Sequence, residues 1–384
     1  MKIADFCKTA AGGTPLKSKK EFYEGGNIPW LLSGEVNNRD IFQTKKFITQ
    51  AGLDGSSAKI FPENTVLIAM YGATAGEVGM LRCKAATNQA VCGIYPNEKV
   101  LPEYLYYFFL SHKDLLVAQA VGNAQPNISQ LKIKNTEIPL PSIPEQKRIV
   151  AILDQAFADI DKARANAEQN LKNSRELYLS KKCEIFGNVQ AESEAISLPS
   201  VCESIFAGGD APKKGMFSKT KTEQFQIPIY ANAVKNNGLY GFTDYARADK
   251  PSITIAARGS GTGHIELRRE PFLPIVRLIV LIPDGNKVSL EYLKHALQNL
   301  DILRSGSAIP QLTVPMIKEY SIPVPSLDKQ RSVIEELDYL NRLVEQVQKS
   351  YKKKILLLEE LKKSVLQKVF SGELTKNDKQ GAAA

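Results

Sequence analysis

The chain has 384 residues, 43% of them hydrophobic, and a formal net charge of +9. This length and composition exclude a chain that is disordered throughout and allow two or more ordinary domains with buried cores. The mild basic excess occurs in both halves and is compatible with two sites on a polyanion such as nucleic acid. With five cysteines, no CxxC motif and three histidines, the sequence predicts neither a disulfide framework nor a metal site.

The N-terminal segment lacks the long apolar stretch of a signal peptide. The longest apolar runs, near residues 105–110 and 278–282, are too short to cross a bilayer. We therefore expect no membrane segment and a cytoplasmic location.

Residues 1–141 are predicted to form the first globular domain, of mixed α and β structure. A buried strand is expected from Thr65 to Met70, just before the glycine at Gly72. A helix is expected from Pro102 to Leu116, with the proline in its first turn.

A long helix is predicted over residues 142–187. It begins after the Pro-rich segment that ends at Ser142, contains no glycine as far as Ile185, and meets Gly187 where a helix C-terminus is expected. The polar residues 188–200 are predicted to be a linker between two halves of the chain.

A second globular domain is predicted at 201–325, with strands at 252–257 and 278–282 and a helix over 289–303, capped by Ser289. A second long helix follows at 326–372, and residues 373–384 are predicted to be a tail.

The two halves are copies of one unit. Ile138-Pro-Leu-Pro-Ser142 recurs as Ile322-Pro-Val-Pro-Ser326, a shift of 322 − 138 = 184 positions, and the same shift maps Gln146 to Gln330. A period this long indicates a duplicated domain rather than a solenoid. The fold class expected is therefore α+β: two α/β globular domains and two long helices in a pseudo-two-fold repeat.

Both long helices carry apolar residues at heptad spacing, which is typical of a coiled coil. Because a two-fold axis across the helices would pair them antiparallel, we expect them to pack on each other. Packing of each helix on its own domain or on another protein is the alternative. The predicted seam is Ile149, Leu153, Ile160, Leu177, Val333, Leu337, Leu340, Val344, Val347, Leu358 and Leu361.

The motifs of the catalytic chemistries considered are absent from the sequence. There is no Asn-Pro-Pro-Tyr-like tetrapeptide for methyl transfer to a base and no GxxxxGK[ST] loop for a nucleoside triphosphate. Pro283-Asp284 followed by Glu291-Tyr-Leu-Lys294 faintly suggests a nuclease pattern, but the carboxylate and the lysine are three positions apart instead of two. The glycine turn at 259–263 is interpreted as a tight turn rather than a phosphate cradle. We expect no catalytic residue, no metal and no cofactor in this chain.

Polar, basic and aromatic residues in the predicted loops suit DNA instead. Lysine mainly neutralises phosphates, whereas arginine and asparagine can distinguish guanine and adenine edges. For any single residue the alternative is a solvated loop side chain. The candidates in the first copy are Lys17, Lys19, Lys20, Trp30, Ser33, Asn37, Asn38, Arg39, Tyr71 and Arg82. Those in the second copy are Lys213, Lys214, Tyr230, Asn232, Lys235, Asn236, Asn237, Tyr240, Arg258, Arg268 and Arg269.

Three features together resemble the specificity subunits of type I restriction–modification enzymes. These are the Gly-Gly turns at Gly12 and Gly208, the two Ile-Pro-x-Pro-Ser segments that lead into long helices, and the ending from Leu361 to Leu374. The resemblance implies that each globular domain is a target-recognition domain that reads one half of a bipartite DNA sequence. The loops after Pro29 and Pro228 differ, so two unlike half-sites are expected.

The same resemblance implies that the helices dock methyltransferase subunits, two of them, and that restriction subunits join the complex. S-adenosylmethionine, ATP and Mg²⁺ would then belong to these partner subunits. Three alternatives stay open: a subunit of a methyltransferase-only or other phage-defence complex, a methyltransferase fused to a recognition domain, and a protein-binding scaffold that does not bind DNA.

Overall fold

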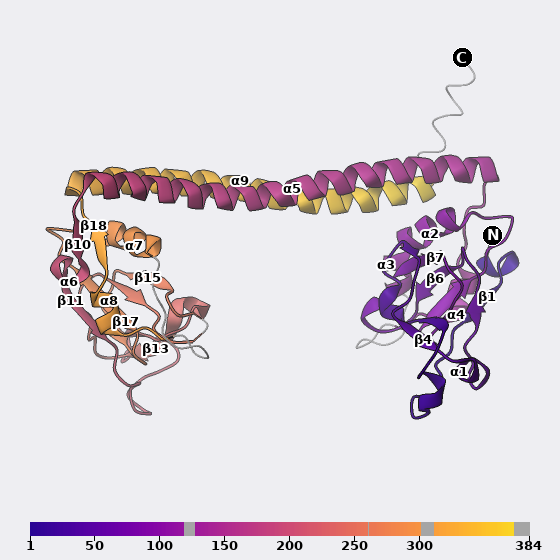
Figure 1. Cartoon of the computed structure of the whole chain (residues 1–384), viewed down its shortest axis with the longest axis horizontal. Helices are drawn as coiled ribbons and strands as arrows, with labels where there is room; N and C mark the ends of the chain where they lie inside the picture. Colours follow the sequence, from indigo (N-terminus) through magenta and orange to yellow (C-terminus); the bar gives the residue numbers. More distant parts are fainter. Residues whose placement is uncertain (119–126, 260, 301–310, 372–384) are drawn as a thin grey trace, which may run out of the picture. The chain divides into compact units, whose positions relative to one another are not determined.

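The computed structural model describes residues 1–118, 127–259, 261–300 and 311–371 (Figure 1). The chain divides into two compact units: residues 1–168 with 353–384, and residues 169–352. The division falls inside both long helices, so each unit contains one globular domain and a part of each helix. The predicted tail at 373–384 lies outside the described residues.

The globular domain of the first unit contains two sheets, with strand orders β1-β9-β6-β7-β3 and β4-β2-β8-β5. Val66 and Ile68 of β6 lie in one core cluster, and Leu67 and Ala69 in another, because successive side chains of a strand point to opposite faces. The strands are β1 Thr9–Ala11, β2 Ile28–Leu31, β3 Asp40–Ile41, β4 Lys46–Ile48, β5 Ile60–Phe61, β6 Val66–Ala69, β7 Val78–Leu81, β8 Ala85–Thr87 and β9 Val91–Ile94.

Helix α2 of this domain covers the sheet with a row of buried aromatic residues. The single helix predicted over residues 102–116 was wrong, because the structure breaks it at His112. There the Ser111 hydroxyl and the His112 ring both bond the carbonyl of Phe108, in competition with the helical backbone. The helices are α1 Gln50–Asp54, α2 Pro102–Ser111, α3 Lys113–Ala118 and α4 Gln130–Asn135.

The second unit repeats this architecture. Its sheet β11-β17-β14-β15 corresponds to β1-β9-β6-β7, and β13-β12-β16 corresponds to β4-β2-β8. The strands are β10 Ala195–Ser197, β11 Cys202–Ala207, β12 Ile227–Tyr230, β13 Leu239–Thr243, β14 Ser252–Ile255, β15 Ile265–Arg268, β16 Leu273–Pro274, β17 Ile279–Pro283 and β18 Ser321–Pro323. The helices are α6 Leu198–Val201, α7 Leu290–Asn299 and α8 Val314–Lys318, and the Ser289 hydroxyl caps α7 as predicted.

The repeat extends to individual hydrogen bonds at the start of each long helix. The Gln146 amide is fully buried; it accepts from Leu101 N at 2.8 Å and donates to the carbonyls of Lys99 and Pro141. Gln330, also fully buried, makes the same three bonds with Ser289 N, Lys287 O and Pro325 O. We call each set a glutamine clamp, because it fixes the beginning of a long helix to the beginning of α2 or α7.

The long helices are α5 Ile143–Glu192 and α9 Leu327–Phe370, and they pack together antiparallel as predicted. In the first unit Lys362 pairs with Asp161 at 2.8 Å and Arg164 with Glu359 at 3.0 Å, so numbers rise along α5 as they fall along α9. In the second unit Lys329 pairs with Glu192 at 3.2 Å. The predicted fold class, with two repeated α/β domains and two paired helices, is confirmed.

Gly187 does not end the first long helix, so the predicted boundary was wrong. Helix α5 continues to Glu192 because Phe186 and Val189, on either side of the glycine, are buried in the core of the second unit. This packing outweighs the roughly 1 kcal/mol that glycine costs in a helix. The rest of the predicted linker is also structured, since β10 and α6 lie within it.

Eight of the eleven predicted seam residues are covered at least in part. Ile149, Leu153, Ile160, Val333 and Leu337 are buried, and Leu340, Val344 and Leu358 are half-buried. Leu177, Val347 and Leu361 are exposed by 56%, 42% and 47%, and their assignment was wrong.

At the three exposed positions the covered side chain is the next one along the helix. Tyr178, Gln348 and Lys362 are half-buried, and the Lys362 ammonium lies 4.6 Å from the centre of the ring of the buried Phe157. A row three residues after Leu153 and a row four residues after it have the same seven-residue period, so apolar spacing alone did not distinguish them.

Candidate nucleic-acid interface

Strand register brings four loops of the second unit to one edge. Ala207 at the end of β11 and Ile255 at the end of β14 both pair with Ile279 at the start of β17. Tyr230 at the end of β12 pairs with Pro274 at the end of β16. Backbone hydrogen bonds such as Val276 N to Gly209 O at 2.7 Å join the two sheets here, so the segments that follow these strand ends start from the same edge. They are residues 208–226, 231–238, 256–259 with 261–264, and 275–278. We call this set the loop edge of the second unit.

The first unit has an equivalent loop edge at residues 12–27, 32–39, 70–77 and 88–90. Here Ala11 pairs with Cys92, Ala69 with Val91 and Leu31 with Thr87. Backbone hydrogen bonds join the segments directly, for example from Gly13 N to Thr87 O at 2.8 Å.

Asn232 organises the loop edge of the second unit. Its side-chain amide accepts from Ala257 N at 2.8 Å and donates to the carbonyl of Val276, so it links three of the four loops. The side chain of Arg258 follows directly and is exposed, with Nη2 3.2 Å from Gln311 Oε1. Asn232 was predicted to contact DNA, but both ends of its amide are engaged within the protein, and we assign it a positioning role.

Asn236 and Asn237 protrude from the β12–β13 connection in the left-handed conformation, with φ of 52° each. Gly238 follows with φ of 78°, and a Cβ atom there would lie 2.7 Å from the carbonyl oxygen of Ala231. Asparagine and glycine tolerate this conformation best, which explains why they occur here. The turn leaves both asparagine side chains exposed.

Most of the predicted basic and amide side chains are exposed at or near the loop edges. In the first unit these are Lys17, Lys19, Lys20, Asn37, Asn38 and Tyr71, with Ser33 half-buried. In the second unit they are Lys213, Lys214, Lys235, Asn236, Asn237 and Arg258. Tyr240 is half-buried and its ring lies 3.4 Å below the Lys219 ammonium.

Trp30 has a structural role, which corrects its predicted role as a DNA contact. Its side chain is only 3% exposed and packs edge-on against Tyr23. The indole N–H donates to the carbonyl of Gly13 at 3.1 Å, which satisfies its single polar atom inside the core. No face of the ring remains for a base.

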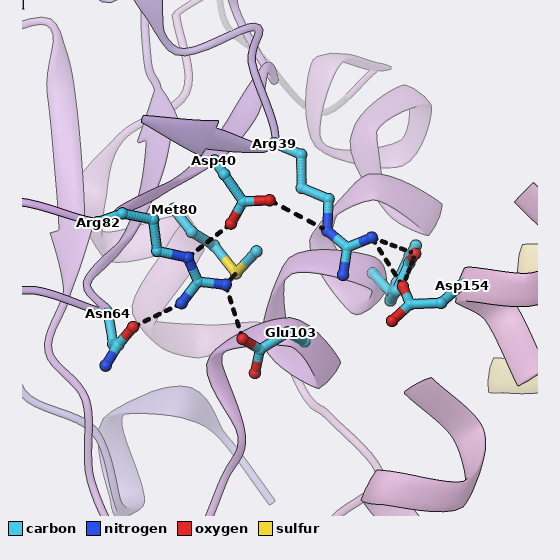
Figure 2. Close-up of polar contacts among 8 residues, drawn as sticks. Arg39, Asp40, Asn64, Met80, Arg82, Glu103 and Asp154 are labelled. Atoms are coloured by element: carbon cyan, nitrogen blue, oxygen red, sulfur yellow. Dashed lines mark hydrogen bonds and ion pairs between the residues drawn. The ribbon is translucent and has the colours of Figure 1, made fainter. Parts of the chain in front are cut away.

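Arg39 and Arg82 are also held inside the first unit (Figure 2). Arg82 pairs with Asp40 at 2.6 Å and with Glu103 at 2.7 Å, and Arg39 pairs with Asp154 of α5 at 2.7 Å. These pairs bind the sheet to α2 and α5. Because the charges of both guanidinium groups are matched by carboxylates, neither is well suited to bind phosphate, contrary to prediction.

Two arginines of the second unit are also engaged within the protein. The Arg268 side chain is buried beneath the Tyr230 ring, with its guanidinium carbon 3.7 Å from the ring centre, and it donates to Asn237 O at 2.6 Å. Arg269 pairs with Glu291 at 2.5 Å. Tyr230 thus serves as a platform for Arg268, and the prediction that these residues contact DNA is not supported by their placement.

Replacing Arg82 with alanine should lower the free energy of unfolding by about 2 kcal/mol, because Asp40 and Glu103 lose their partner in a half-buried setting. Arg82 follows β7 and lies away from the loop edge, so the DNA sequence preference should not change. Chemical denaturation and a DNA-selection experiment on the same variant would test both parts. An altered preference with unchanged stability would contradict this assignment.

Two exposed arginines escaped prediction. Arg247 lies beside Gly209, where a Cβ atom would be 3.6 Å from its Nη1, and Arg277 lies in the turn between β16 and β17. Arg277 stands within the apolar run Ile275-Val-Arg-Leu-Ile279, which resembles a continuous strand and conceals the turn. Arg247 follows no recognisable motif.

Comparison with known proteins places the chain in a family. The model of the type I restriction modification DNA specificity domain matches residues 1–169 and again residues 191–356. The chain therefore belongs to this family and carries its domain twice. No helix within the described ranges is long and apolar enough to cross a membrane.

Relatives and solved structures agree with this class. A specificity subunit from Mycoplasma pneumoniae, S.MpnORF89P, is 30% identical over 65% of this chain and 76% of its own length. The MjaIX specificity subunit of Methanocaldococcus jannaschii is 24% identical over 97% and 92%. The match to the Escherichia coli EcoR124I/EcoR124II specificity subunit, at 32% identity, covers 40% of this chain and 39% of that protein.

A chain from a solved type I R-M system has the same fold, with a TM-score of 0.77 at 19% identity over 96% of both chains. The HsdS subunit from Thermoanaerobacter tengcongensis gives 0.65 at 18% identity over 97% and 96%. Together with the family match, these findings show that the protein is a type I restriction–modification specificity subunit with two target-recognition domains.

Proposed function

We propose that each unit reads one half of a bipartite sequence in double-stranded DNA through its loop edge. The observation that carries the proposal is the second loop edge itself. Its four loops start from one side of the sheets and expose arginine, asparagine and lysine together. Arginine and asparagine match guanine and adenine edges in the major groove, and lysine neutralises phosphates.

The two half-sites are unlike, because the same framework carries different loops. After Trp30 in β2 the first copy continues Leu31-Leu-Ser-Gly-Glu, and after Tyr230 in the equivalent strand β12 the second continues Ala231-Asn-Ala-Val-Lys. The net charge of +9 supports general attraction to DNA, while the loop side chains supply discrimination.

Catalysis is assigned to partner subunits. Two methyltransferase subunits would dock on the long helices and bring S-adenosylmethionine, and restriction subunits would bring ATP and Mg²⁺. Several large apolar side chains on these helices are exposed and suit a protein partner: Leu177 and Leu179 on α5, and Leu356, Leu357 and Leu361 on α9. Such a complex acts on genomic DNA, so we infer a cytoplasmic location.

The proposal is tested by assembling the chain with its methyltransferase subunits and selecting targets from a library of random duplexes. Two unlike half-sites are expected. Exchange of residues 1–140 for a relative's domain should change one half-site only. Absence of any sequence preference in the assembled complex would favour a protein-binding scaffold, and methyl transfer by the chain alone would favour an enzyme.

Replacing Arg258 with alanine should weaken binding of the cognate sequence roughly 5- to 150-fold, as expected when a bidentate contact to a base is lost. The loss should concern one base pair in the half-site of the second unit. Arg269→Ala is the matched control, because Arg269 is already paired with Glu291. If both variants weakened all sequences equally, Arg258 would be a phosphate contact.

A further inference from the structure

The turn that joins β16 to β17 has an unusual backbone. Val276 and Arg277 occupy its two central positions with φ of 54° and 61°, and Leu278 N donates to Ile275 O at 3.1 Å across it. Two consecutive left-handed residues are the pattern of a type I′ turn, which favours Asn-Gly. A β-branched valine followed by arginine is disfavoured there, so the surrounding structure must impose the conformation.

Hydrogen bonds to neighbouring segments hold the turn. Val276 N donates to Gly209 O at 2.7 Å, Arg277 N to Gly208 O at 3.2 Å, and Gly208 N to Leu278 O at 2.8 Å. The Asn232 side chain also donates to the carbonyl of Val276. Close approach requires glycine at 208, since a Cβ atom there would lie 2.6 Å from the carbonyl of Pro274.

The first unit shows that the fold does not require this strain. Its equivalent turn, Asn88–Val91, closes with the same bond, from Val91 N to Asn88 O at 3.2 Å, and Gly12 N likewise donates to Val91 O. Neither central residue, Gln89 or Ala90, has a positive φ, and Ala90 is buried. The left-handed pair is therefore specific to the second unit, where it presents the residue equivalent to Ala90 to solvent.

That residue is Arg277. It is exposed and, within the part of the chain that the structure describes, no carboxylate pairs with it, in contrast to Arg39, Arg82 and Arg269. Two other arginines lie near this turn. Asn232 links Val276 to Ala257, and Arg258 is the residue after Ala257. Gly209, whose carbonyl accepts from Val276 N, lies beside the Arg247 guanidinium. Two arginines from other segments, Arg247 and Arg258, thus lie near the turn that carries Arg277.

From this geometry we infer that Arg277 is a specificity-determining residue that reads a guanine in the half-site of the second unit. The strained turn holds the guanidinium away from the protein, so that its planar fork is available for the N7 and O6 acceptors of guanine. A strained backbone conformation lowers the stability of the folded protein, and such conformations cluster at functional sites. The inference rests on the proposed function, because it names a contact within that DNA interface.

The test uses the full chain assembled with its methyltransferase subunits and a library of random DNA duplexes. Arg277→Ala should weaken the preferred sequence roughly 5- to 150-fold and relax the preference at one base pair of one half-site. Arg277→Lys should not restore the preference, because an ammonium group lacks the bidentate geometry. The other half-site should be selected as before.

Arg269→Ala is the matched control. Arg269 is an arginine of the same unit, but it pairs with Glu291 at 2.5 Å and follows the end of β15 that lies away from the loop edge, so the complex should retain its preference and its binding within about twofold. Arg277→Lys, which keeps a long cationic side chain, maintains the test if the alanine variant folds poorly.

Each outcome has a definite meaning. Relaxation at one base pair supports the inference. A uniform loss over all sequences, or an unchanged preference in Arg277→Ala, overturns it and leaves the proposed function intact. If the unmodified complex selects no sequence at all, both the inference and the proposed function are refuted.

Discussion

Replacing Gln330 with leucine should destabilise the second unit by about 3–5 kcal/mol. The glutamine clamp satisfies Ser289 N and the carbonyls of Lys287 and Pro325 in a site where the glutamine is 0% exposed. Leucine fills similar space but bonds none of the three backbone groups, and each buried group left without a partner costs roughly 1–3 kcal/mol. Urea denaturation followed by circular dichroism would measure the loss.

Two variants frame this experiment. Gln346→Leu changes an exposed glutamine of the same helix and should alter the free energy of unfolding by no more than about 0.5 kcal/mol. Gln146→Leu removes the equivalent clamp and should destabilise the first unit by a similar amount. Equal small effects at positions 330 and 346 would show that the clamp contributes little.

Replacing Lys182 with leucine should stabilise the second unit at neutral pH, whereas Gln330→Leu should destabilise it. The Lys182 side chain is buried, its ammonium bonds Gln298 Oε1 at 3.1 Å, and Lys294 lies nearby. Burial, with a smaller contribution from Lys294, lowers the pKa of Lys182 from 10.5 to about 8. The other copy of the repeat already has leucine at the equivalent position. Position 182 + 184 = 366 is Leu366, which lies in the core of the first unit.

The pH dependence follows from this shift. Below about pH 8 Lys182 is charged in both the folded and the unfolded chain, and the folded chain bears the full cost of burying the charge. Between pH 8 and 10.5 the unfolded chain binds more protons, so the stability of the unmodified protein rises with pH. Lys182→Leu should lack this rise and should gain about 1–3 kcal/mol at pH 7.

Unfolding free energies of the two proteins, measured from pH 7 to above pH 10, would show the difference directly. Comparison between variants is needed because tyrosines and cysteines also titrate in this range. Lys181→Leu is the control, since Lys181 is exposed and pairs with Glu184 at 2.6 Å. A leucine variant that is less stable than the parent, or that keeps the same pH slope, would contradict the interpretation.

The sequence predicted the architecture well because the repeat carries strong local signals. Long segments without proline or glycine indicated α5 and α9, and one constant shift placed Gln146 and Gln330 in equivalent positions. The register of the helix seam was less accessible. Phe157 and Ala156 are both compatible with a heptad, and only packing against Lys362 of α9 distinguishes them.

The candidate interface was harder to predict for a physical reason. An arginine is available to DNA only if no carboxylate neutralises it, and the partners of Arg82 are 42 and 21 residues away in the chain. Pairing over such distances arises from strand register, which the sequence does not display. Arg277 was missed because the left-handed turn exposes it, and the sequence Val276-Arg277 does not favour such a turn.

The two glutamine clamps also bear on how such a protein can change over generations. Each globular domain is attached to its helix through the same three backbone hydrogen bonds, and a tyrosine hydroxyl adds a fourth: Tyr104 to Pro139 O at 2.9 Å and Tyr292 to Pro323 O at 2.7 Å. The attachments are chemically interchangeable, whereas the loops that differ lie at the free ends of the strands. Recombination between genes that breaks the chain at these joints can therefore replace a recognition domain as a whole, without new compensating mutations in the helices.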